Sequence, residues 1–144
     1  MAIVDNNNQS VVDRDDAVSI GLKLPIVLDN GQLASTKTTL EAVKQNILNL
    51  CNTEVGERVM QPTLGVRLKR FLFEPFTEDT VLQVQDIILE SVNYWLPFVN
   101  LNDIQVKMSD NESGDFRSAM EISINFSLKR DPETLEMIQV TVSG

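Results

Sequence analysis

The sequence predicts an α+β fold: two amphipathic helices and a short helical turn packed on a C-terminal antiparallel meander of three strands, preceded by an extended N-terminal arm. Three observations support this prediction. Apolar residues recur at helical spacing in two stretches between residues 38 and 95. From residue 103 onward they alternate with polar residues, which is the period of half-buried strands. Short links join the alternating stretches, which favours an antiparallel sheet covered by the helices in a second layer.

Length and composition indicate one globular domain. The chain has 144 residues, of which 42% are hydrophobic and 23% charged, so it can bury a core and is not disordered in bulk. No apolar run approaches the ~18 residues of a membrane-spanning helix. The N-terminal stretch lacks the basic start and apolar core of a signal peptide, so we expect neither export nor a membrane partner.

The net charge and the absence of certain residue types exclude several classes of function. The net charge is −9, which repels nucleic acid and anionic lipid and leaves proteins with basic patches as plausible partners. There is no histidine, which removes the usual Ser-His and Cys-His pairs. Cys51 is the one cysteine, so no internal disulfide or zinc cluster can form. Its setting favours a small apolar residue on a helix face over a reactive thiol.

Residues 1–37 are expected to form an arm and residues 38–144 the domain. The first 18 residues are polar and show no period, which is typical of a flexible segment. Ile20, Leu22 and Leu24 then alternate with Gly21 and Lys23, which indicates a short strand or extended segment. The run "DNG" that ends at Gly31 predicts a tight turn.

The first helix should begin at Thr38, where "TTLE" forms a capping box with Glu41, and should end near Asn52. Its apolar face consists of Leu40, Val43, Ile47, Leu50 and Cys51.

The second helix should begin after Thr77, with Glu78 and Asp79 in its first turn, and should end before Pro97. Its apolar face consists of Val81, Val84, Ile88, Val92 and Trp95.

Between the helices, "GERVMQPTLGVRLKRFLFEP" contains Gly56, Pro62 and Gly65, which interrupt any regular element. A short helix is expected next, with Leu68, Phe71, Leu72 and Phe73 as its apolar residues and Arg67, Lys69 and Arg70 toward solvent. Pro75 should end it. The basic cluster is either a solvated face or a docking surface for acidic partners.

Two aromatic residues follow prolines at corners, namely Phe76 and Phe98. Aromatic residues at helical spacing are usually core residues, whereas these two positions favour exposure. We therefore expect Phe76 and Phe98 to act as interface anchors.

Three alternating segments form the predicted sheet. They are Ile104–Met108, Met120–Leu128 and Ile138–Val142, and "RDPET" is expected to turn the chain between the last two. If the last segment lies at a sheet edge, its backbone N–H and C=O groups can accept a strand from another chain. The alternative is an edge that its terminal position protects.

Candidate chemistry is sparse. Glu57 and Glu74 are the best candidates for a glycosidase pair, which needs carboxyl groups ~5–9.5 Å apart. Basic neighbours lower a carboxyl pKa, however, which is the wrong direction for a general acid. Residues 109–115, "SDNESGD", faintly resemble a calcium loop but favour a solvated turn. We expect no catalytic residue, metal or cofactor, and we expect Glu57 and Arg58 to hold the corner by ion pairs or backbone hydrogen bonds.

The segment "VGERVMQPTLGVRLKRFLFEP" resembles the signature of the small baseplate wedge proteins of contractile-tailed phages. This family includes the corresponding subunit of type VI secretion systems and is regarded as a sheath initiator. The resemblance covers roughly Thr38 to Val142. The matching residues are Gly56, Glu57, Arg58, Met60, Pro62, Leu64, Gly65, Leu68, Leu72, Phe73, Glu74 and Pro75, with Leu64 where an aromatic residue is common.

One departure from the family concerns the Glu-Pro-Arg triplet that commonly follows its second helix. In the family, this triplet looks like a docking point for the wedge core. Here Tyr94 is present, but the triplet aligns with Leu96, Pro97 and Phe98. Both charges are missing, so the resemblance implies an apolar contact at this position.

The resemblance implies a non-catalytic subunit of the virion's tail baseplate, assembled in the host cytoplasm. Its partners would be other baseplate wedge proteins and the tail sheath protein, whose first ring it would template by β-strand addition along Ile138, Val140 and Val142. Wedge contact and the corner itself would involve Gly56, Glu57, Arg58, Pro62, Gly65, Arg67, Arg70, Phe73, Glu74, Pro75, Leu96, Pro97 and Phe98. Two alternatives are a peptidoglycan hydrolase that uses Glu57 or Glu74, in line with the word lysozyme in older family descriptions, and an anti-adaptor binding protein.

Overall fold

The structure is a computed structural model that describes residues 19–23, 25–109 and 119–144. These residues fall into two compact units that meet in sequence between Asn49 and Leu50, and each unit is described separately. The flexible arm expected over residues 1–18 and nearly all of the calcium-like stretch lie outside the described residues.

The first unit begins with a small hairpin. Strand β1 (Gly21–Leu22) pairs antiparallel with β4 (Ser35–Thr36), and β2 (Leu28–Asp29) pairs with β3 (Gln32–Leu33). The "DNG" turn is confirmed: Asn30 and Gly31 take φ values of 50° and 80°, the left-handed pair that a two-residue hairpin loop requires. Residues 21–36 therefore fold back on themselves.

Helix α1 (Thr39–Asn52) follows directly and crosses the boundary between the units. Its predicted cap is confirmed, because the Thr38 hydroxyl accepts a hydrogen bond from the Glu41 N–H at 3.2 Å. The Glu41 carboxylate in turn accepts from the Lys37 N–H at 3.3 Å, one residue before the usual capping-box donor. Of the predicted apolar face, Val43, Ile47, Leu50 and Cys51 are buried and Leu40 is partly buried.

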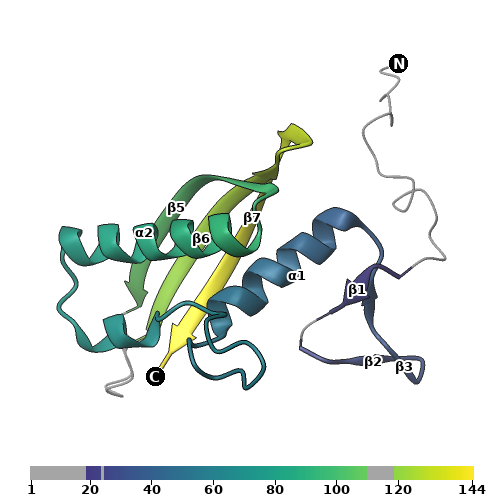
Figure 1. The fold of residues 1–144 in the computed structure, drawn as a ribbon, viewed down its shortest axis with the longest axis horizontal. Helices are drawn as coiled ribbons and strands as arrows, with labels where there is room; N and C mark the ends of the chain where they lie inside the picture. Colours follow the sequence, from purple (N-terminus) through teal and green to yellow (C-terminus); the bar gives the residue numbers. More distant parts are fainter. Residues whose placement is uncertain (1–18, 24, 110–118) are drawn as a thin grey trace. The chain divides into compact units, whose positions relative to one another are not determined.

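The second unit contains the antiparallel sheet. Strands β5 (Val99–Ser109), β6 (Ala119–Leu128) and β7 (Asp131–Ser143) pair in the order β5-β6-β7, which confirms the meander (Figure 1). Seven apolar side chains of the central strand and of the end of β7 are almost fully buried: Met120, Ile122, Ile124, Phe126, Ile138, Val140 and Val142.

The turn between β6 and β7 lies earlier than predicted. It consists of Lys129 and Arg130, and β7 already begins at Asp131, so "DPET" belongs to the strand. A register irregularity between Phe126 and Leu128 lets Leu128 pair with Asp131 across this tight turn. Local sequence favoured the proline as the turn residue, whereas the sheet register fixed the turn two residues upstream.

Helix α2 (Glu78–Trp95) packs against the sheet alongside β5 and forms the second layer (Figure 1). The predicted N-cap is confirmed, because the Thr77 hydroxyl accepts from the Thr80 N–H at 3.3 Å. The core face is confirmed at Val84, Ile88 and Val92, each with an exposed fraction of 0%. The helix ends at Trp95, as the proline at position 97 predicts.

The short helix between α1 and α2 is a 3₁₀ turn, η3 (Lys69–Phe73). Leu68, Phe71 and Leu72 are buried as expected, but the Phe73 side chain is 84% exposed. A 3₁₀ helix has three residues per turn, so Phe73 shares a side with the exposed Arg70 rather than with Phe71. Among the described residues, no helix is both long and apolar enough to cross a membrane.

Candidate partner-binding site

The corner between α1 and η3 is closed by a backbone hydrogen bond. Gly56 donates its N–H to the Pro62 carbonyl at 2.7 Å and takes a φ of 94°. Residues 56–62 therefore form a closed loop. At its tip, the side chains of Val59 and Met60 are 94% and 92% exposed, so two apolar residues project into solvent.

Two glutamates brace this corner. Glu57 accepts a hydrogen bond from the Glu54 N–H at 3.0 Å through its carboxylate. The Glu54 carboxylate accepts from the Lys69 N–H at 3.2 Å, which ties the corner to the start of η3. The prediction that Glu57 holds the corner through a backbone hydrogen bond is confirmed. Glu57, Arg58 and Glu74 are all exposed.

At Gly65 the chain passes very close to the backbone of Thr53. This glycine is buried, it has a φ of 125°, and a Cβ placed there would collide with the Thr53 carbonyl. That same carbonyl accepts a hydrogen bond from the Val66 N–H at 2.9 Å, so it is held in place. Only glycine satisfies both the left-handed backbone and the close approach.

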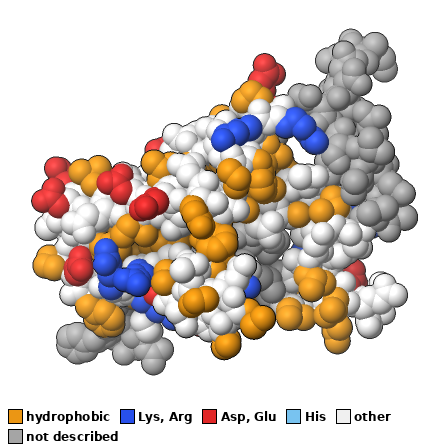
Figure 2. Space-filling model, in the orientation of Figure 1, with side chains coloured by type: hydrophobic (Ala, Val, Ile, Leu, Met, Phe, Trp, Pro, Cys, Tyr) orange, Lys and Arg blue, Asp and Glu red, His pale blue; other side chains and the backbone are white. Residues whose placement is uncertain are grey.

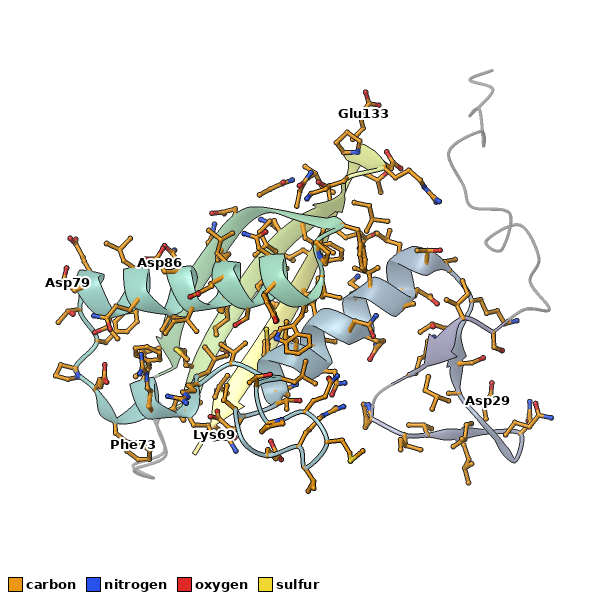
Figure 3. The ribbon with its side chains drawn as sticks, viewed as in Figure 1. Asp29, Lys69, Phe73, Asp79, Asp86 and Glu133 are labelled. Carbon is orange, nitrogen blue, oxygen red and sulfur yellow. The ribbon has the colours of Figure 1, made fainter. Side chains whose placement is uncertain are left out.

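Around η3 the surface is basic and partly apolar. Arg67, Lys69 and Arg70 are exposed as predicted, and Figure 2 shows Lys and Arg side chains gathered near this element. The Arg70 guanidinium lies 4.5 Å from the centre of the buried Phe71 ring, a cation–π contact that holds it near the surface. The labelled Phe73 side chain projects from η3 (Figure 3).

The exit corner after α2 presents a second apolar surface. Pro97 and Phe98 are exposed and Leu96 is partly buried, with Phe98 46% exposed. Phe76, at the entry to α2, is 48% exposed, so the expected exposure of both corner phenylalanines is confirmed. Phe98 also accepts a hydrogen bond from the Lys129 N–H at 3.0 Å through its carbonyl, which fixes this corner against the sheet.

Strand β7 lies at an edge of the sheet, because in the described part of the chain it pairs with β6 alone. The side chains of Ile138, Val140 and Val142 fill the core, so this strand can offer a partner only its backbone and its outer face. Two halves of the strand differ. Residues 131–136 include Pro132 and three carboxylates, features that protect edges, whereas residues 137–143 contain no proline and no charge.

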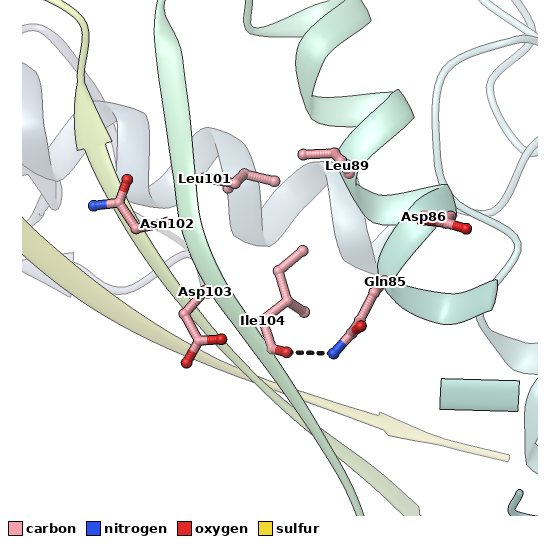
Figure 4. A pocket seen from close by; sticks show the side chains of 7 residues that line it. All are labelled: Gln85, Asp86, Leu89, Leu101, Asn102, Asp103 and Ile104. Atoms are coloured by element: carbon pink, nitrogen blue, oxygen red, sulfur yellow. Dashed lines mark hydrogen bonds between the residues drawn. The ribbon is translucent and has the colours of Figure 1, made fainter. Parts of the chain in front are cut away.

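Strand β5 forms the opposite edge and has two protective features. Asn102 is an extra residue that shifts the register between Leu101 and Asp103, which is a β-bulge. Gln85 on α2 donates its side-chain N–H to the Ile104 carbonyl at 2.6 Å. An open hollow of about 260 Å³ lies beside this bond between α2 and β5 (Figure 4).

The chemistry available within residues 19–23, 25–109 and 119–144 is limited. This part of the chain contains no group of three or more His, Cys, Asp or Glu side chains placed to hold a metal ion. Cys51 is buried, and burial raises the pKa of its thiol to about 12, which suppresses the reactive thiolate. The structural interpretation of Cys51 is therefore supported over the reactive one.

Three features escaped the sequence interpretation: the role of Glu54, the exposed pair Val59 and Met60, and the bond of Gln85. The run "GERVMQP" offered a signal for the exposed pair, since apolar residues inside a Gly-to-Pro loop have no periodic face to bury. Gln85 gave no signal, because its partner lies 19 residues away in sequence.

A sheet edge that has no hydrogen-bonded neighbour strand among the described residues, an apolar loop tip and a basic corner give this small domain several surfaces suited to contact other proteins. The family described as baseplate wedge protein gp25 matches residues 37–133, and the chain belongs to this family. It is therefore a member of a family of structural baseplate subunits. A search among curated proteins finds no match.

Two solved structures have a fold similar to that of this chain. A chain in the baseplate of the anti-feeding prophage is 25% identical, with a TM-score of 0.62; the match covers 75% of this chain and 83% of that one. A protein described as a tail lysozyme from Geobacter sulfurreducens is 21% identical, with a TM-score of 0.59, and the match covers 74% and 92%. The second similarity concerns the fold alone.

Proposed function

We propose that this protein docks on other wedge proteins in the tail baseplate of a contractile injection machine and templates the first ring of tail sheath by β-strand addition. The observation that supports this most directly is the outer edge of β7, where residues 137–143 form an uncharged, proline-free strand that pairs on one side only among the described residues. Assembly would take place in the host cytoplasm and the product would be the virion's baseplate.

Strand addition suits this edge because the backbone supplies the binding energy and the outer side chains supply the selection. Ile138, Val140 and Val142 anchor the strand in the core, so the edge is presented as a rigid template. A rigid template loses little conformational entropy when a partner strand binds. The carboxylates and Pro132 upstream limit the addition to the last part of the strand.

Docking on the wedge would use the two corners. Gly56, Glu57, Pro62 and Gly65 fix the path of the first corner and so hold Val59 and Met60 outward. The remaining wedge contacts we propose are Arg58, Arg67, Arg70, Phe73, Glu74 and Pro75 around η3, and Leu96, Pro97 and Phe98 at the second corner. An exposed phenylalanine beside basic side chains suits a partner surface that combines apolar and acidic groups.

We propose no catalytic role for the two candidate carboxylates. Glu57 is engaged with the Glu54 backbone, and both Glu57 and Glu74 lie on exposed surface, where a carboxyl group lacks the apolar setting that a general acid needs. A cell-wall clearing assay with the wild type, Glu57→Gln and Glu74→Gln tests this point. Clearing by the wild type that either substitution abolishes would establish the hydrolase instead.

The test of the main proposal is nucleation of the matching sheath protein. Gln139→Lys and Thr141→Lys, alone and together, place lysines on the exposed side of β7, where they hinder strand approach. We expect the double variant to fold normally and to lose nucleation. Gln105→Lys is the matched control, because it adds the same side chain to the other edge strand and should retain nucleation. Equal nucleation by all variants would refute strand addition at β7.

A further inference from the structure

The two edges of the sheet are not equivalent, and the difference lies in one side chain of α2. In an antiparallel sheet, an edge strand exposes a row of backbone N–H and C=O groups that can recruit another strand. Both β5 and β7 are edge strands within the described residues. At β5, however, the Ile104 carbonyl is already occupied by the Gln85 side chain at 2.6 Å.

Figure 4 shows the geometry of this bond. The Ile104 carbonyl points away from the other strands and toward α2, and the Gln85 amide reaches it from the helix. Ile104 is paired in register with Ile124 of β6 on the inner side of the strand. Its outward carbonyl is therefore an acceptor to which the backbone N–H of an added strand would have to donate. Gln85 therefore takes the place of an incoming backbone donor.

The bulge strengthens the effect. Asn102 is inserted between Leu101 and Asp103, so the regular alternation of outward groups is interrupted two residues before Ile104. A partner strand would have to match this irregularity and also displace the Gln85 amide. We propose that Gln85, together with the bulge at Asn102, closes the β5 edge, so that β7 is the one of the two described edge strands that accepts a partner strand. The closure of β5 is independent of the function proposed above. Its effect on the orientation in which sheath subunits add rests on that function.

In a polymer that grows by strand exchange, closing one edge of the template prevents incorrect strand pairing. A template with two open edges could pair with a second copy of itself or receive a sheath strand on the wrong side. A template with one open edge adds its partner in a single orientation. Gln85 lies on α2, yet it is a specificity-determining residue because its side chain blocks the edge of β5.

The test uses the full chain and two matched substitutions on α2. Gln85→Ala removes the donor, and Gln85→Glu keeps the side-chain size but replaces the donor with an acceptor that repels the carbonyl. Gln83→Ala is the control, because Gln83 is exposed on the same helix. Each substitution is combined with Gln105→Cys, which places a reporter thiol on β5. The native Cys51 is buried and does not compete in the cross-linking reaction.

We expect both Gln85 variants to form dimers with rising concentration, detected by sedimentation, and to yield disulfide-linked dimers through position 105 under mild oxidation. The wild-type and Gln83→Ala backgrounds should remain monomeric and unlinked. If both Gln85 variants keep a folded circular dichroism spectrum yet stay monomeric and unlinked over the same concentrations, the closure proposal is wrong. Failure of the wild type to nucleate sheath would instead refute the proposed function and leave this cross-linking result unaffected.

Discussion

Glu54 and Glu57 are joined by two hydrogen bonds. The Glu57 carboxylate accepts the Glu54 N–H at 3.0 Å, and the Glu57 N–H donates to the Glu54 carbonyl at 3.1 Å. This reciprocal pair fixes the turn at which the chain leaves α1. It also engages the carboxylate that a hydrolase would need for catalysis.

Replacing Glu57 with alanine should weaken the corner without unfolding the domain. A hydrogen bond of this kind contributes about 1 kcal/mol to the free energy of unfolding, so we expect a loss of that size for Glu57→Ala. Glu57→Gln keeps an acceptor oxygen and should lose less than half as much. Urea denaturation measures both values. Equal losses for the two variants would show that charge, rather than the accepted bond, stabilises the turn.

Gly65 and Gly56 provide a matched pair of substitutions. Both have positive φ, but a Cβ at Gly65 collides with the Thr53 carbonyl, whereas a Cβ at Gly56 meets nothing within 4 Å. Backbone strain alone costs about 1–3 kcal/mol, so Gly56→Ala should lose an amount in that range. Gly65→Ala should lose clearly more or fail to fold, as thermal unfolding can measure. Similar losses at the two sites would mean that the Thr53 backbone shifts to make room.

Cys51 should be inert in the folded protein. Its thiol pKa is raised from 9.0 to about 12 by burial, so a maleimide should modify it only after unfolding. Above pH 9 the unfolded chain loses this proton while the folded chain keeps it. The folded state then binds more protons than the unfolded state, and the free energy of unfolding falls as the pH rises from 9 toward 12. Cys51→Ala should reduce this alkaline loss, which pH-dependent denaturation can detect. Rapid labelling of the native protein at neutral pH would contradict the prediction.

The loop tip should matter for assembly and not for folding. Val59 and Met60 are almost fully exposed, so the double change Val59→Ser and Met60→Ser should alter the free energy of unfolding by no more than about 0.5 kcal/mol. If the tip is a wedge contact, the same variant should bind the matching wedge proteins more weakly in a co-purification or calorimetric assay. Unchanged wedge binding would exclude the tip from the interface.

The second corner gives a comparable prediction. Phe98 is 46% exposed, and its backbone, not its ring, holds the corner to Lys129. Phe98→Ser should therefore leave the Lys129 hydrogen bond in place and reduce wedge binding through lost apolar contact. Phe98→Leu is the conservative control and should retain most of the binding. A Phe98→Ser variant that binds like the wild type would remove this corner from the proposed surface.

Much of the fold follows from local sequence. Thr77 and the period of Val84, Ile88 and Val92 define α2, because capping and amphipathic spacing are properties of neighbouring residues. The alternation of apolar and polar residues defines the strands, because it too is a property of neighbouring residues. The start of β7 at Asp131 and the exposure of Phe73 did not follow, since the first depends on the register with β6 and the second on the 3₁₀ geometry of η3.

The candidate site likewise has some features that the sequence predicts and others that only the tertiary structure shows. The sequence by itself determined that Gly56, Pro62 and Gly65 form a corner and that the last strand has an apolar face, since both depend on residue types and their spacing. Only the tertiary structure decided which of the described strands are edges and that Gln85 donates a hydrogen bond to one of them. The physical reason is that an edge is defined by the absence of a hydrogen-bonded neighbour, which depends on how distant segments are arranged and cannot be encoded in a local pattern.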